Sequence, residues 1–131
     1  MNEQRRLMLE AGDQAAALAK AGAESVRGLT YAAAVDMFPQ DVRRVLGGLH
    51  AMTDNLPHLL GQLDTTLVRQ LQEQDLSVAG GTHVGDPGAA LSHAHDALDL
   101  AASVAELLAD LVAKAQQALD FLAADRGDPQ D

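Results

Sequence analysis

Apolar side chains recur at alternating spacings of three and four residues along the stretch from Gly88 to Ala124. This spacing keeps side chains on one seam of an α-helix. The stretch contains no proline and no internal glycine, so the pattern predicts one long helix. The seam consists of Leu91, Ala94, Leu98, Ala101, Ala105, Leu108, Val112, Ala115, Leu119 and Leu122.

A second apolar stripe runs beside this seam. A helix that lies on a core needs one apolar stripe about 100° wide. The 88–124 helix is apolar over more of its circumference, so we expect at least two packing partners, one of which can be a second copy of the chain. The second stripe consists of Ala97, Leu100, Val104, Leu107, Leu111, Ala118 and Phe121. Within it, the expected interaction surface is Leu100, Val104, Leu107 and Leu111.

Helical spacing also covers two earlier stretches, residues 2–35 and 39–74. Gly28 followed by Thr30 favours a break in the first stretch, where one helix ends and a short one is capped. In the second stretch, Pro57 removes a backbone hydrogen bond and disfavours helix before it, which predicts a kink or break. The apolar stripe of the second stretch consists of Val42, Val45, Leu49, Met52, Leu56, Leu59, Leu63, Leu67 and Leu71.

A glycine-rich linker at 76–86 separates the second and third stretches. Asp86 as N-cap with Pro87 in the first helical position is a strong helix start. The polar segment 125–131 predicts a flexible acidic tail. We therefore expect a single helical domain over residues 1–124 that contains the linker.

The second and third stretches are nearly equal in length, so they can fold as a hairpin about the linker. This predicts an all-α fold, an elongated antiparallel bundle of three long helices, or four to five if the chain breaks near Gly28 and Pro57. The hairpin register sets Leu63 near Leu100, Leu56 near Leu107 and Val42 near Phe121. The expected core residues of the third helix are Leu98, Leu108, Val112, Leu119 and Leu122, and Leu108→Ala is expected to cost about 2–5 kcal/mol.

Composition narrows the function classes. A formal net charge of −10 argues against nucleic acid and against anionic membranes as partners. No apolar run reaches the ~20 residues of a membrane span, and there is no cysteine for disulfides or thiolate sites. Only 2% of residues are aromatic, and nothing indicates a cofactor. A charged N-terminal segment without an apolar core favours a cytoplasmic protein, and the alanine-rich, isoleucine-free composition is typical of a bacterial high-GC genome.

Three residues have the spacing of a possible metal site. His50, Asp54 and His58 lie at i, i+4 and i+8, which an unbroken helix would place on one face, and imidazole with carboxylate can hold zinc, iron or manganese. Pro57 lies inside the set, and solvated or capping histidines are the alternative.

The favoured hypothesis is a non-enzymatic protein that acts through self-association, as a homo-oligomer such as a dimer, or through another protein partner. A metal-binding bundle or metal-dependent enzyme that uses the three residues above is the alternative. A small apolar-ligand carrier with a cavity beside Gly47, Gly48 and Pro57 is a further one. Whether the protein is an enzyme stays open, with the balance against it.

Overall fold

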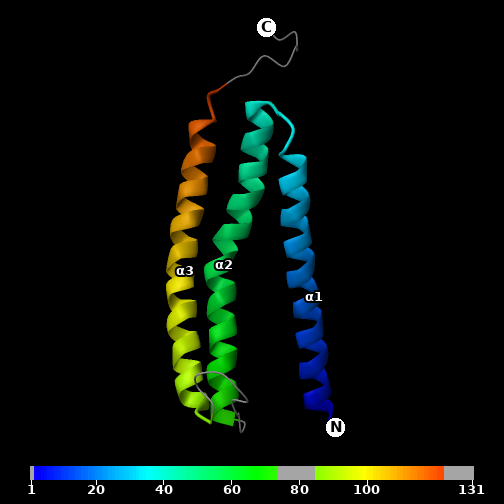
Figure 1. Ribbon diagram of the computed structural model, residues 1–131, viewed down its shortest axis with the longest axis vertical. Coiled ribbons are helices and arrows are strands. Elements are labelled where there is room, and N and C mark those ends of the chain that lie inside the picture. Colours follow the sequence, from blue (N-terminus) through cyan, green and yellow to red (C-terminus); the bar gives the residue numbers. More distant parts are fainter. Residues whose placement is uncertain (1, 74–84, 123–131) are drawn as a thin grey trace. The chain divides into compact units, whose positions relative to one another are not determined.

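The computed structural model describes residues 2–73 and 85–122 (Figure 1). It contains three long helices, α1 (Glu3–Ala32), α2 (Pro39–Glu73) and α3 (Pro87–Ala118), and the described residues contain no strand. The predicted all-α class with three long helices is therefore confirmed. Contacts divide the chain into two units, residues 1–37 and 38–131, which are described separately.

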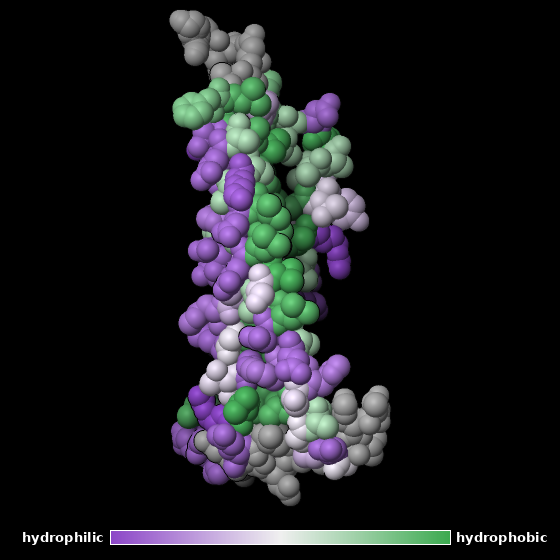
Figure 2. All heavy atoms as spheres, turned by 90° about the vertical axis from the view of Figure 1, so that its left-hand side faces the viewer, coloured by the Kyte–Doolittle hydropathy of each residue, from purple (hydrophilic) through white to green (hydrophobic). Residues whose placement is uncertain are grey.

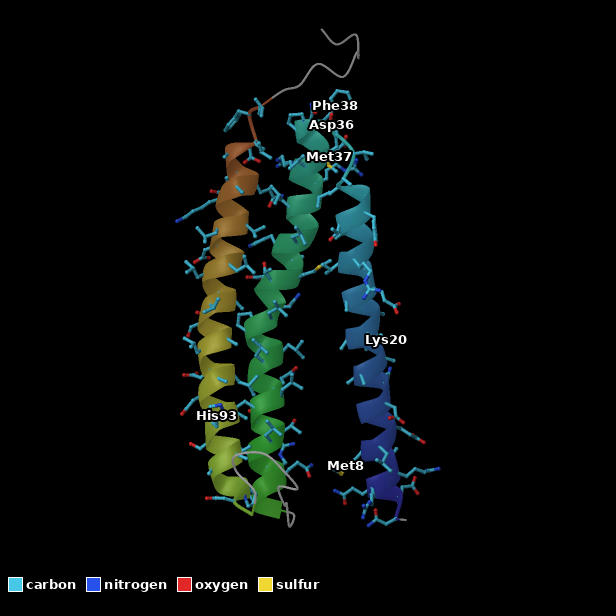
Figure 3. All side chains as sticks on the ribbon, viewed as in Figure 1. Met8, Lys20, Asp36, Met37, Phe38 and His93 are labelled. Carbon is cyan, nitrogen blue, oxygen red and sulfur yellow. The ribbon has the colours of Figure 1, made fainter. Side chains whose placement is uncertain are left out.

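The first unit contains α1, which starts where the Asn2 side chain accepts a hydrogen bond of 2.7 Å from the backbone N–H of Arg5. No side chain of α1 is buried. The break expected near Gly28 is absent, since the helix continues to Ala32. Thr30 explains part of this result, because its hydroxyl donates to the carbonyl of Val26 four residues back and does not cap a new helix. The unit ends at Asp36 and Met37, which Figure 3 labels at the junction before α2.

The second unit begins with α2, which runs through Pro57 without a break. Proline lacks the N–H that would donate to the carbonyl of Thr53, and helices bend at such positions. Figure 1 shows α2 changing direction near its middle. The buried hydroxyl of Thr53 also donates to the carbonyls of Leu49 and His50, a contact that favours bending. The sequence therefore predicted a kink correctly, and the helix count stays at three.

Helix α3 starts as predicted. Gly85 has φ of +77°, which favours glycine, and the Asp86 side chain accepts a hydrogen bond of 2.9 Å from the N–H of Ala89. The helix ends at Ala118, earlier than the predicted Ala124, and a turn follows. The tail expected at 125–131 and residues 76–84 of the expected linker lie outside the described residues.

Helices α2 and α3 pack side by side and run antiparallel (Figure 1). Nε of Arg43 lies 2.6 Å from Oδ1 of Asp120, and a Cβ on Gly47 would lie 2.9 Å from Nε2 of Gln116. The residue numbers 43 and 120, like 47 and 116, add to 163. The pairs predicted from the sequence, such as Leu56 with Leu107, have the same sum, so the structure has the expected hairpin register.

The face of α3 that contacts α2 differs from the predicted seam by one residue at alternate positions. Ala105 and Ala109 are buried, at 6% and 4% exposure, whereas Leu108 and Leu122 are 45% and 51% exposed. The prediction that Leu108 and Leu122 belong to the core of the hairpin is therefore wrong. Alanines on the contact face let the two backbones approach, and this turns the leucines beside them outward. The other three expected core residues, Leu98, Val112 and Leu119, are half-buried, and Phe121 is 98% exposed and does not pack on Val42.

Candidate functional site

The hairpin leaves large apolar side chains open on both of its helices. On α2, Met52, Leu59 and Leu63 each stand one residue before a position that faces α3, namely Thr53, Leu60 and Asp64. On α3, Val104, Leu108 and Leu111 stand one residue before Ala105, Ala109 and Val112 in the same way.

This common offset places the open side chains of α2 and α3 on the same side of the hairpin. One residue back along a helix is a rotation of about 100°. Two antiparallel helices are related by an approximate two-fold axis normal to the plane that contains them. Such an axis carries one side of the pair onto itself, so equivalent offsets on α2 and α3 point to one side.

We call this side the open apolar face. Its members have 45–56% exposure. Figure 2 looks at the α3 side of the hairpin and shows hydrophobic side chains as a strip along the helix, bordered by a strip of hydrophilic ones. The open apolar face consists of Met52, Leu59, Leu63, Val104, Leu108 and Leu111.

All four residues predicted as an interaction surface are exposed, and two of them, Val104 and Leu111, belong to the open apolar face. The other two, Leu100 and Leu107, lie two residues from positions that face α2 and therefore point away from α2. Their exposure in the hairpin agrees with a stripe separate from the α2 contact. Their role in binding stays a prediction. The sequence did not identify the contribution of α2, because its apolar stripe was assigned to the contact with α3.

Ion pairs join the two helices toward both ends of the hairpin. Arg43 pairs with Asp120 at one end, and Nδ1 of His95 lies 2.6 Å from Oδ2 of Asp64 at the other. The hydrogen bond to Asp64 raises the pKa of His95, and the charges of Asp64, Asp96 and Asp99 add to this effect. Oδ1 of Asp64 is buried and has no hydrogen-bond partner, so the carboxylate contacts His95 through one oxygen.

Sequence reasoning missed the pair between Asp64 and His95. The predicted register placed residue 99 at the height of Asp64, whereas Asp64 contacts His95, four residues earlier. Long side chains can reach positions three or four residues away along a helix. A search of positions within four residues of the predicted register could therefore have found the pair. His93, labelled in Figure 3, lies on the same part of α3 and is exposed.

The structure does not assemble the predicted metal site from His50, Asp54 and His58. Among the described residues, no group of three or more histidine and acidic side chains could hold a metal ion. The physical reason is distance along the helix, since eight residues span about 12 Å and metal–ligand bonds are about 2 Å long. The continuous helix through Pro57 keeps this separation.

The space considered for an apolar ligand is also unsuitable. The side chain of Gln116 occupies the position beside Gly47. Near Pro57, an open depression on α2 is lined mainly by polar residues, among them His58, Thr65 and Arg69. A carrier of apolar molecules needs an enclosed apolar cavity, and neither place provides one.

No family model, curated protein or solved structure matches this chain. None of the helices in the described ranges is long and apolar enough to cross a membrane.

Proposed function

We propose that this protein works by protein–protein association through the open apolar face, without catalysing a reaction. The observation that supports the proposal is the placement of six large, roughly half-exposed apolar side chains on one side of the α2–α3 hairpin. Apolar patches larger than a few hundred Å² are rare on monomeric proteins and mark interaction sites.

The energetics favour covering this face. Full burial of a leucine, valine or methionine side chain stabilises by about 1.5–3 kcal/mol, so completing the burial of a half-exposed one contributes about 1 kcal/mol. Six such side chains give a gross gain on the order of 6 kcal/mol. Association itself costs on the order of 4–15 kcal/mol, so contacts of the flanking residues have to add to this gain.

The polar groups that α2 and α3 bring together serve the hairpin itself. Arg43 with Asp120, and Asp64 with His95, connect one helix to the other. These pairs hold the two halves of the open apolar face in register. In the proposed function they position the face and do not act on a substrate.

The absence of native cysteine makes a direct test possible. In the variant Leu108→Cys, the thiol lies on the open apolar face, and in the control Ser103→Cys it lies on an exposed position about 140° away on the same helix. We expect Cys labelling at position 108 to slow at least about tenfold as the concentration of the full chain, or of added cell extract, is raised. Labelling at position 103 should change little.

Two results would overturn the proposal. Labelling at position 108 that stays as fast as at position 103 under all conditions would show a face bare to water. Protection at position 108 that is independent of concentration in a monomeric protein would show that the chain's own α1 covers the face. In either case the face would not serve association.

A further inference from the structure

We infer that the protein that covers the open apolar face is a second copy of this chain. Two hairpins pack face to face about a two-fold axis parallel to the helices, and α2 of one copy lies beside α3 of the other. This inference rests on the proposed function and names its partner. Three observations support it: the area of the face, its symmetry and the charges that flank it.

The area fits a dimer. A half-exposed side chain of this size leaves on the order of 75 Å² open, so six leave on the order of 450 Å² before the flanking polar residues are counted. A stable interface buries about 800 Å² on each partner. The face with its flanks therefore has the size that a two-fold contact needs.

The shape of the face is self-complementary. Its two halves lie on antiparallel helices of similar length, α2 with 35 residues and α3 with 32. A two-fold interface requires the same patch on both copies, with each half meeting the other half. In the inferred dimer every helix has two antiparallel neighbours, as in a four-helix bundle.

The flanks of the face differ in charge. The flank of each helix is formed by positions that are rotated about a further 80–100° around the helix from the open side chains, in the direction away from the other helix of the hairpin. The flank of α2 carries Arg44 and Arg69, with Asp41 next to Arg44 at 3.4 Å. The flank of α3 carries Asp96 and Asp110, with Lys114 as its single base.

These charges select the direction of the axis. An axis parallel to the helices places the flank of α2 against the flank of α3 from the other copy, so that net opposite charges meet. An axis perpendicular to the helices, within the interface, places each flank against its own copy. The acidic flank of α3 would then face itself, which is unfavourable.

The register identifies one pair across the interface. A rotation about an axis parallel to the helices keeps every residue at its own height. Because residue numbers that add to 163 share a height, Arg69 lies level with position 94 of α3. Asp96 is two residues away, or about 3 Å along the axis. Both side chains are exposed in the single hairpin, and we assign them as an intermolecular ion pair, formed twice in the dimer.

The inferred dimer also explains the shift of the seam in α3. Ala101, Leu108 and Ala115 fit the predicted seam, yet the hairpin leaves them exposed. Leu108 is a member of the open apolar face, and Ala101 and Ala115 lie next to it on the helix, seven residues before and after. In the dimer they point to the centre that all four helices share. The apolar seam predicted from the sequence therefore corresponds to the core of the dimer and not to that of the single hairpin.

The charge pair is tested by reversal in the full chain. We expect Arg69→Glu to raise the dimer dissociation constant about tenfold, and Arg69→Glu with Asp96→Arg to restore it to within about threefold. Arg27→Glu, the same charge change at an exposed position of α1, is the matched control and should change the constant less than threefold. An equal effect of Arg69→Glu and Arg27→Glu, or no restoration by the second substitution, overturns the pairing.

The direction of the axis is tested by spin labels at Gln72→Cys, an exposed position in the last turn of α2. The inferred axis puts both labels at one end of the dimer, within about 35 Å, whereas a perpendicular axis separates them by about 45 Å or more. The longer distance overturns the inferred arrangement. A chain that stays monomeric while extract protects position 108 overturns the second copy as partner and leaves the proposed function standing. A monomer with an unprotected position 108 overturns both.

Discussion

Nδ1 of His95 on α3 lies 2.6 Å from Oδ2 of Asp64 on α2, and this pair joins the two helices of the hairpin near the end where α3 begins. The hydrogen bond raises the pKa of His95 above its ordinary value of 6.5. A raised pKa in the folded state means that folding favours the protonated imidazole. The stabilisation is therefore complete below pH 6.5 and is lost as the pH rises through the raised pKa.

This sign leads to a prediction for His95→Gln. We expect the variant to unfold at lower urea concentration than the wild type at pH 6, with a difference that shrinks by pH 9. NMR titration of His95 provides the direct check. Asp64→Asn should lower the pKa of His95 toward 6.5, because the interaction with the Asp64 carboxylate is the largest cause of the raised pKa. A difference in urea midpoint that is the same at both pH values would contradict the role of the protonated imidazole.

The close contact of α2 and α3 at Ala109 leads to a second prediction. Ala109 is 4% exposed, so Ala109→Leu forces the helices apart and should cost about 1–3 kcal/mol of unfolding free energy. The control Ser103→Leu, on the exposed side of α3, should stay within about 0.5 kcal/mol of wild type. Urea unfolding followed by circular dichroism measures both, and equal stabilities for the two variants would show that Ala109 is not at a tight contact.

The N-cap of α3 leads to a third prediction. Asp86→Ala removes the acceptor for the N–H of Ala89 and should lower the stability of the hairpin by about 0.5–2 kcal/mol. Asp86→Asn keeps an acceptor at this position and should retain most of the stability. Thermal unfolding of the two variants separates them, and a loss that is equal for alanine and asparagine would exclude the cap as the cause.

Much of the fold could be predicted from the sequence because the helical signals are strong and local. Apolar periodicity, the cap at Asp86 and the matching lengths of the two stretches were sufficient for three helices and for the hairpin register. The expected break at Gly28 was wrong, because a single glycine costs a helix only up to about 1 kcal/mol and the residues around it continue the pattern. Pro57 bends α2 without ending it.

The candidate site was harder to predict, because an apolar stripe does not state which neighbour it meets. The three- and four-residue spacing of the seam can be continued through either Leu108 or Ala109. Only the packed hairpin shows that Ala109, and not Leu108, faces α2. With Leu108 at 45% exposure, Leu108→Ala should cost the isolated hairpin less than the 2–5 kcal/mol of a buried leucine. The metal hypothesis required His50, Asp54 and His58 to share one face of a helix. Residues can share a face and still be too far apart along the helix axis to bind one metal ion, as His50 and His58 are.

The most direct measurement is the mass of the full chain in solution by light scattering across a concentration series. We expect a reversible transition from 13.7 kDa to twice that mass. Val104→Ser combined with Leu111→Ser should hold the chain at 13.7 kDa with its helical circular dichroism unchanged. A wild type that stays at 13.7 kDa at every concentration, or a double variant that reaches the mass of the wild type, would contradict association through the open apolar face.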